Sequence, residues 1–312
     1  MLRADELLRQ MLRIRLIEEA IAERYKEGKM RCPVHLSVGQ EAAAVGVCAV
    51  LKPKDKMVST HRGHAHYLAK GGSIDGLIGE LYGKVTGCAR GNGGSMHLID
   101  LNVDFWASTS IVAGTVPVGV GLAFADKLQK KDHVTVICIG DAAIEEGVFH
   151  EAANFASLHQ LKVLFVCENN LYSCYTRINY RQPPRPIHAV AQAHNLLYEK
   201  TKPNNAMDIA KRTRELIYRV REGRPGFLEI PTYRYLEHCG PNNDDELGYR
   251  VKQEVRDWHE LDPLEELASW EATKVAVIKS IFRDEINDAF TRAEQASYPQ
   301  EEEVGAYVYA NS

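Results

Sequence analysis

An amphipathic helix opens the chain. Apolar residues recur every three or four positions over residues 5–26, the spacing typical of one helical face. Gly28 follows, a residue that commonly ends helices. The apolar face consists of Leu8, Leu12, Leu16, Ile17, Ala20, Ile21 and Tyr25.

Two continuous apolar runs, residues 134–139 (VTVICI) and 162–167 (KVLFVC), are typical of strands buried in a parallel sheet. The helical face between them contains Phe149, Ala152, Ala153 and Ala156. The order strand, helix, strand predicts a crossover unit. A third run, residues 226–230, follows a helix expected over residues 206–222. We therefore predict an α/β fold with a doubly wound, mostly parallel sheet flanked by helices.

The rest of the chain shows no internal repeat and no low-complexity linker. Residues 31–94 are rich in Gly and His, with a short helix expected over residues 40–51, and this favours loops arranged around a site. We expect a single domain over residues 1–312, with its first helix within residues 1–30 and a peripheral tail over residues 298–312.

Asp141 and Asn170 each come directly after or near the end of a predicted strand. In a doubly wound sheet, ligands bind beyond the carboxyl ends of the strands. A carboxylate and an amide oxygen suit Mg²⁺, which usually arrives with phosphate, and the amides of Ala142 and Ala143 favour an anion. Alternatively, Asp141 caps a helix and Asn170 makes a turn, and these two residues alone do not decide between the two interpretations.

Composition is that of an ordinary globular protein: 312 residues, 45% hydrophobic and 26% charged. With 38 basic and 42 acidic side chains the formal charge is −4, so electrostatics favour neither nucleic acid nor a membrane surface as partner. The uncharged residues 105–125 include Ser, Thr, Pro and Gly, which predicts a buried segment and not a membrane span.

The seven cysteines are scattered and contain no C-x-x-C pair, as expected of reduced thiols in a cytoplasmic protein. Arginines near the start of the chain alternate with acidic residues, which argues against a mitochondrial presequence.

Residues 140–173 (GDAAIEEGVFHEAANFASLHQLKVLFVCENNLYS) resemble the thiamine diphosphate motif, with Asp141 and Asn170 29 positions apart. More narrowly, residues 10–255 resemble the α subunit of the decarboxylating component of 2-oxo acid dehydrogenase complexes, the pyruvate, branched-chain and acetoin dehydrogenase group. The further matching segments, in family order, are HLSVGQEA (35–42), STHRGHAHYLAKGG (59–72), GCARGNGGSMHL (87–98), IVAGTVPVGVGLA (111–123) and PTYRYLEH (231–238).

This resemblance implies a site for thiamine diphosphate and Mg²⁺. It implies that the metal is ligated by Asp141, Asn170 and the backbone carbonyl of Tyr172, in a motif that also contains Gly140, Ala142 and Ala143. Arg62 matches the arginine that contacts the diphosphate, and His61 stands where relatives often carry Tyr. The segment with Ser110 and Val112 matches the stretch that contacts the aminopyrimidine and bends the cofactor, for which a stiff branched side chain is suitable.

Catalytic roles are implied for several histidines. His35 matches a residue near the bound oxo acid, His238 matches the active-site loop histidine, and Arg234 matches a residue that anchors that loop. His64 is a further catalytic candidate. A zinc cluster formed by His61, His64 and His66 is the alternative, but no Cys pair supplies a fourth ligand at close spacing.

The resemblance also implies the reaction and the partners. The cofactor decarboxylates a 2-oxo acid, or cleaves acetoin, and the fragment passes to a lipoyl group on an acyltransferase. A β subunit supplies the glutamate that activates the cofactor, in a heterotetramer of two α and two β chains. Two other hypotheses stay open: transfer of the fragment to a sugar or aldehyde, and a non-catalytic α-like protein kept for assembly.

Two departures from the family pattern bear on these expectations. Ala142 stands in place of a glycine, which costs of order 1 kcal/mol if the turn requires a positive φ. Around His238, relatives usually have Gly-His-Ser followed by Asp-Pro, with a phosphorylatable serine, whereas residues 237–246 of this chain read EHCGPNNDDE, with Cys239 in place of the serine. Kinase control of the mitochondrial type is therefore not implied, and we expect an acidic loop beside the substrate entrance.

Overall fold

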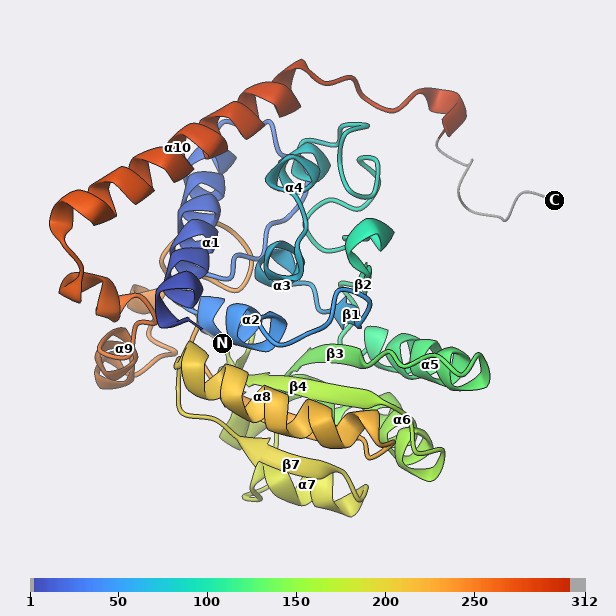
Figure 1. Cartoon of the computed structure of the whole chain (residues 1–312). Helices are drawn as coiled ribbons and strands as arrows, with labels where there is room; N and C mark the ends of the chain where they lie inside the picture. The colour runs from blue at the N-terminus through green and yellow to red at the C-terminus, as the bar shows by residue number, and fades with distance from the viewer. Residues whose placement is uncertain (1–2, 304–312) are drawn as a thin grey trace.

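The computed structural model describes residues 3–303 (Figure 1). Residues 304–312 of the expected tail lie outside the described residues. The α-helices are α1 (Ala4–Tyr25), α2 (Glu41–Cys48), α3 (His64–Lys70), α4 (Ile74–Leu81), α5 (Thr115–Leu128), α6 (Gly147–Leu158), α7 (Ile187–Ala193), α8 (Ala206–Arg221), α9 (Lys252–His259) and α10 (Ala272–Gln295). The strands are β1 (Lys56–Ser59), β2 (Phe105–Ser108), β3 (Thr135–Gly140), β4 (Val163–Asn169), β5 (Tyr172–Ser173), β6 (Thr176–Arg177), β7 (Leu197–Lys200) and β8 (Gly226–Pro231).

Six strands form a parallel sheet in the order β2-β1-β3-β4-β8-β7. The strands at its centre are in register to their carboxyl ends: Gly140 pairs with Glu168, and Asn169 pairs with Pro231. This register brings Asp141 and Asn170 to the same edge of the sheet, as the order of the motifs predicts.

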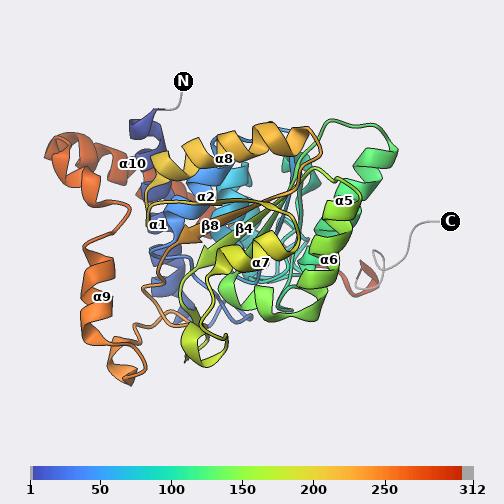
Figure 2. The same cartoon turned by 90° about the horizontal axis from the view of Figure 1, so that it is seen from below.

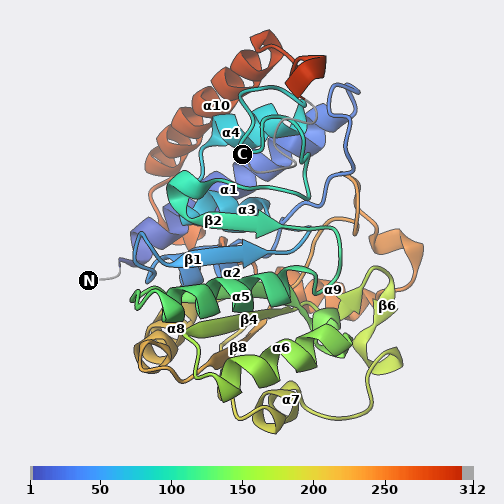
Figure 3. The ribbon, with the colours of Figure 1, turned by 90° about the vertical axis from the view of Figure 1, so that its right-hand side faces the viewer.

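Helices cover both faces of the sheet, which explains why its central strands are mostly apolar. On β3, Val136 and Cys138 belong to the core shared with α1, α2, α4 and α8, whereas Ile137 and Ile139 belong to the core shared with α5, α6 and α7. Figure 2 shows α8 on one side of β4 and β8, with α6 and α7 on the other, and Figure 3 shows α5 and α6 across the second face.

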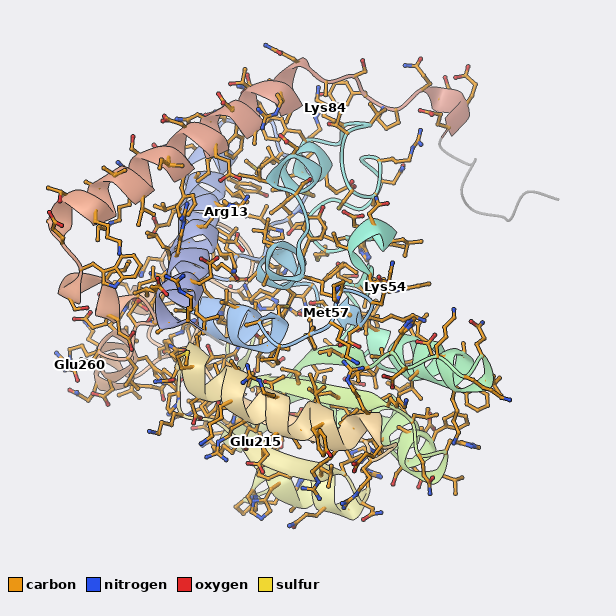
Figure 4. All side chains as sticks on the ribbon, viewed as in Figure 1. Arg13, Lys54, Met57, Lys84, Glu215 and Glu260 are labelled. Carbon is orange, nitrogen blue, oxygen red and sulfur yellow. The ribbon has the colours of Figure 1, made fainter. Side chains whose placement is uncertain are left out.

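The N-terminal helix packs against α2 and also against the long helix α10 (Figure 1). Arg13 of α1 forms an ion pair with Glu285 of α10, and the Arg13 label in Figure 4 marks this side of α1. Leu12 packs against Ile278 and Phe282. The α1 face that the sequence predicts therefore has two partners, the main core and α10.

A glycine-rich segment, residues 87–94, is held by one buried carboxylate. Glu80 of α4, 1% exposed, accepts hydrogen bonds from the amides of Ala89 (2.8 Å), Gly91 (2.9 Å), Gly93 (2.6 Å) and Gly94 (3.2 Å). Backbone amides that have no other partner in the fold are thus satisfied by a side chain, which fixes the path of a segment without regular structure.

The predicted strands β3, β4 and β8 and the helices α1, α2, α6 and α8 are all present within a few residues of the expected bounds. Residues 105–125 form β2 and most of α5. Among the helices that the structure describes, none is long and apolar enough to cross a membrane.

Candidate active site

A cavity lies at the carboxyl ends of β3 and β4, with an empty volume of about 970 Å³ that includes its open mouth. All residues that the sequence assigned to the site line it, except His64. They are His35, His61, Arg62, Ser110, Val112, Gly140, Asp141, Ala142, Ala143, Asn170, Tyr172, Arg234 and His238.

Asp141 follows β3 directly and is 1% exposed. Its carboxylate accepts a hydrogen bond from Arg181, whose guanidinium also bonds Glu145. Gln182 Nε2 donates to the Asp141 carbonyl at 3.0 Å. Burial raises the pKa of Asp141 to about 6, and Arg181 opposes this shift. At neutral pH the cavity therefore contains a buried, oriented carboxylate.

Asn170 and Tyr172 sit where the chain turns back after β4. Leu171 has a φ of 70°, and the Asn170 side-chain oxygen accepts a hydrogen bond from the Tyr172 amide at 3.1 Å. This is an Asx-type turn. The turn interpretation of Asn170 is thus correct locally, and it does not exclude a metal because a side-chain oxygen has two lone pairs.

Ala142 adopts no positive φ, because residues Asp141–Glu145 form one 3-10 helix. The alanine in place of a glycine therefore causes no backbone strain here. The expected cost of about 1 kcal/mol applied only if the turn required the left-handed region, and it does not.

Arg62 joins three segments of the chain at the cavity wall. It is 6% exposed, and it donates to the carbonyl of Leu36 at 2.7 Å and to the carbonyl of His238 at 3.0 Å. Burial, together with the nearby Arg234, lowers the pKa of Arg62 to about 9, so it remains charged at neutral pH. A fixed guanidinium at this wall favours an anionic ligand.

Arg234 holds the loop after β8. It donates to the carbonyls of Leu236 and Cys174 (the latter at 3.2 Å) and lies 3.3 Å from the carboxylate of Asp244. Asp244 is 2% exposed and also lies 3.4 Å from Arg250.

Within the acidic loop expected beside the substrate entrance, Asp244 is thus buried against arginines. Asp244 turns inward to neutralise arginines, and none of residues 244–246 belongs to the cavity lining. The sequence could not show this, because Arg250, one of the two cations, lies outside the motifs.

His35, His61 and His238 meet in the cavity, with ring centroids 4.7 to 5.2 Å apart. Burial, and then the charge of Arg62, lowers the pKa of His61 to about 3 and that of His238 to about 4, and these two causes also lower the pKa of His35 strongly. All three imidazoles are therefore neutral at pH 7, when each can donate through one nitrogen and accept through the other.

His64 lies behind the cavity and not in it. Its Nδ1 is 3.0 Å from Glu18, its Nε2 is 2.9 Å from the Ser95 hydroxyl, and both nitrogens are buried. Ser95 also accepts a hydrogen bond from the His35 amide at 3.3 Å. The structure does not bring His64 to the reacting centre as a catalytic group, and its contacts support the segment that carries His35.

Sequence reasoning missed two polar groups of the site. Glu168 lines the cavity, 6% exposed, with its carboxylate 3.5 Å from His66 Nε2. It ends an apolar run immediately before Asn169, a signal that could have identified it. Arg181, 40 positions from Asp141, carried no local signal, because it lies in an irregular segment.

The cavity has the donors that magnesium and a diphosphate require. The hard oxygens of Asp141 and Asn170 suit Mg²⁺, and Arg62 and Arg234, which line the same cavity, supply positive charge. A Cβ at Gly140 would meet no atom within 4 Å, so the wall is open directly before Asp141. The residues present therefore fit a metal-bound diphosphate.

Comparison with known proteins assigns the family. The sequence model of the dehydrogenase E1 component family matches residues 9–302. The chain belongs to the dehydrogenase E1 component family.

Its relatives include α subunits from bacteria and a plant. This chain is 34% identical over 309 residues to the α subunit of acetoin:2,6-dichlorophenolindophenol oxidoreductase of Bacillus subtilis. The alignment covers 97% of this chain and 92% of that one. The chain is 33% identical over 313 residues to the pyruvate dehydrogenase E1 component subunit alpha of Rickettsia bellii, and the alignment covers 96% of this chain and 94% of that one. This chain is also 31% identical over 309 residues to the mitochondrial pyruvate dehydrogenase E1 component subunit alpha-2 of Arabidopsis thaliana. The alignment covers 96% of this chain and 78% of that one.

Proposed function

We propose that this chain is the α subunit of a two-chain, thiamine diphosphate- and Mg²⁺-dependent dehydrogenase that acts on a 2-oxo acid or on acetoin. The observation that carries the proposal is the meeting of Asp141, Asn170, Arg62 and His238 in one cavity of an E1 family member. The relatives named above are dehydrogenase and oxidoreductase subunits, which favours this function over transfer of the fragment to a sugar or aldehyde.

In this proposal Asp141, Asn170 and the Tyr172 carbonyl hold Mg²⁺, and Arg62 with the amides of Ala142 and Ala143 holds the diphosphate. Thiamine diphosphate supplies, when bound, the carbon nucleophile that decarboxylation of a 2-oxo acid requires. Arg181 positions the Asp141 carboxylate from behind, as outer-shell groups do for metal ligands.

His35 and His238 act on the substrate as neutral hydrogen-bonding groups. Their lowered pKa values keep them unprotonated at pH 7, so they orient an oxo or carboxylate oxygen through an N–H donor and do not supply charge. Arg62 provides the positive charge of this wall. Ser110 and Val112 line the other side, where the aminopyrimidine would lie.

The activating glutamate comes from a β subunit in our proposal. Within the described cavity lining the carboxylates are those of Asp141 and Glu168. Asp141 is assigned to the metal, and Glu168 is engaged by His66. Ile111 and Val112 at the cavity rim are 67% and 43% exposed, an apolar edge that a partner chain would cover. We extend this to a heterotetramer of two α and two β chains.

The acceptor in the proposed complex is a lipoyl group carried by an acyltransferase. All seven cysteines are unpaired, which supports the reducing, cytoplasmic setting in which such a complex would work.

The test is to co-express the chain with the product of the neighbouring gene and to assay 2-oxo acids and acetoin with an artificial electron acceptor. We expect turnover by the complex and none by either chain alone. Turnover by this chain alone would reject the two-chain proposal. In that case Glu168→Gln shows whether Glu168 is the activating carboxylate. Product formation that depends on an added aldehyde would establish fragment transfer instead.

A further inference from the structure

Three imidazoles from three distant segments share one small volume of the cavity. His35 lies in the loop between α1 and α2, His61 comes after β1, and His238 comes after β8. Their ring centroids are separated by 4.7, 5.1 and 5.2 Å, and the rings meet edge to face. One ligand atom from each ring can be chosen so that all three lie within 4.8 Å of one another.

One of these rings has an unused nitrogen. His35 is 6% exposed, and its Nδ1 is buried without a hydrogen-bond partner. His64, by contrast, is bonded through both ring nitrogens, to Glu18 and to Ser95. A buried polar atom without a partner is costly and points to a ligand that completes it.

We propose that His35, His61 and His238 form a binding site for a first-row transition-metal cation of the Zn²⁺ type, separate from the Mg²⁺ site at Asp141. Three histidines with an open fourth position are a known zinc arrangement, with Zn–N distances of about 2.0–2.1 Å. Tetrahedral bonds of that length place the nitrogens about 3.4 Å apart. The three nitrogens lie at most 4.8 Å apart, so each pair must come closer by no more than about 1.4 Å. Rotation of the partly exposed His61 and His238 side chains would bring them together.

The donor types separate the two sites chemically. Imidazole nitrogen prefers Zn²⁺, Cu²⁺ or Ni²⁺, whereas carboxylate and amide oxygens prefer Mg²⁺. The set differs from His61, His64 and His66, which are close in sequence but face different neighbours in the fold.

The charges around the cluster limit its affinity. Arg62 and Arg234 repel a cation, and Asp244, Glu168 and Glu18 offset part of that repulsion. The Arg62 guanidinium bonds the carbonyls of Leu36 and His238 and so connects the segments that carry the three histidines. We therefore expect binding weaker than at a four-ligand structural zinc site.

The site has one consequence that rests on the proposed function. A cation there would occupy the space in which His35 and His238 meet the substrate, and it would inhibit the enzyme in competition with the oxo acid. The binding itself does not depend on that function, because spectroscopy detects it without turnover.

The experiment is a Co²⁺ titration of the full, tag-free chain in excess Mg²⁺, followed by visible absorption and by displacement with Zn²⁺. We expect one equivalent of Co²⁺ to give the absorption of a low-symmetry nitrogen site. His61→Tyr, a residue that relatives often carry here, should weaken Co²⁺ binding at least tenfold while thermal unfolding shows that the chain stays folded. His35→Gln should do the same.

Two control variants locate the ion. Asp141→Asn removes the proposed Mg²⁺ ligand and should leave Co²⁺ binding unchanged. His150→Gln removes one member of the His150–His194 pair, whose nitrogens are 2.9 Å apart at another place in the fold, and should also leave it unchanged. Absence of a Co²⁺ spectrum, equal binding by His61→Tyr, or loss of binding in either control variant would overturn the proposal, and none of these results depends on catalytic activity.

Discussion

Arg62 donates a hydrogen bond to the main-chain carbonyl of His238 at 3.0 Å, although the two residues are 176 positions apart. The other branch of the guanidinium bonds the carbonyl of Leu36, the neighbour of His35. One buried cation thus gathers the segments that carry His35, His61 and His238. This contact therefore helps to position these histidines in the cavity.

Replacing Arg62 by Gln should therefore disturb both fold and ligand binding. Hydrogen bonds to charged groups contribute about 1.5–3 kcal/mol each, and because Arg62 makes two of them we expect the free energy of unfolding to fall by about 3 kcal/mol. Affinity for thiamine diphosphate should fall at least tenfold. Urea unfolding and calorimetry measure the two effects. Arg62→Lys keeps the charge but loses the fork, so it should be intermediate. Wild-type affinity in Arg62→Gln would show that the arginine does not contact the diphosphate.

Glu80 should be essential to the order of the glycine-rich segment. Glu80→Ala removes the acceptor of four backbone amides, and we expect a loss of about 3 kcal/mol in the free energy of unfolding. Hydrogen exchange of residues 89–94 should accelerate strongly. Glu23→Ala, a change at an exposed glutamate of α1, serves as control and should change neither quantity. Unaltered exchange in Glu80→Ala would contradict the role of this carboxylate.

The three cavity histidines should make the protein sensitive to acid. Their pKa values are lowered by burial, so the unfolded chain binds protons near pH 6.5 while the folded protein does not until pH 3 to 4. The free energy of unfolding should fall as pH drops from about 6.5 toward 4, by up to about 1.4 kcal/mol per pH unit for each histidine.

Urea unfolding at a series of pH values measures this slope. Because His61→Tyr removes one of the three groups, the slope for this variant over the same pH range should be shallower than that of the wild type. Above pH 7 the free energy of unfolding of both proteins should change much less with pH. A slope identical to that of the wild type would mean that His61 is protonated normally in the folded protein.

Sequence reasoning predicted the strands that are buried on both faces of the sheet. The strands β3, β4 and β8 lie between two helical layers, so most of their positions are apolar and each run is visible in the sequence. The strands β1, β2 and β7 are short and contain charged or bulky residues such as Lys56, Trp106 and Lys200. They are recognised as strands from their pairing within the sheet and not from an apolar run in the sequence. The helix α10 was missed, although Ile278, Phe282, Ile286 and Phe290 recur every four residues on its buried side.

The site was predictable where it follows strand ends or motifs and not where it depends on distant contacts. Asp141 and Asn170 follow the ends of adjacent strands, so the sheet itself brings them together. Arg181 reaches Asp141 from an irregular segment, and Asp244 turns away from the cavity to meet Arg234 and Arg250. No sequence pattern fixes the path of these loops. His64, although close to His61 in sequence, points into the protein because α3 begins there.

The central claim is that Asp141 holds the magnesium through which this chain binds thiamine diphosphate. Isothermal titration of thiamine diphosphate with Mg²⁺ into the chain assembled with its β partner, for wild type and Asp141→Asn, tests it most directly. The substitution keeps the size of the side chain and removes the charge, and circular dichroism confirms the fold. We predict that the affinity falls at least a hundredfold. Equal affinities for the two proteins would contradict the assignment.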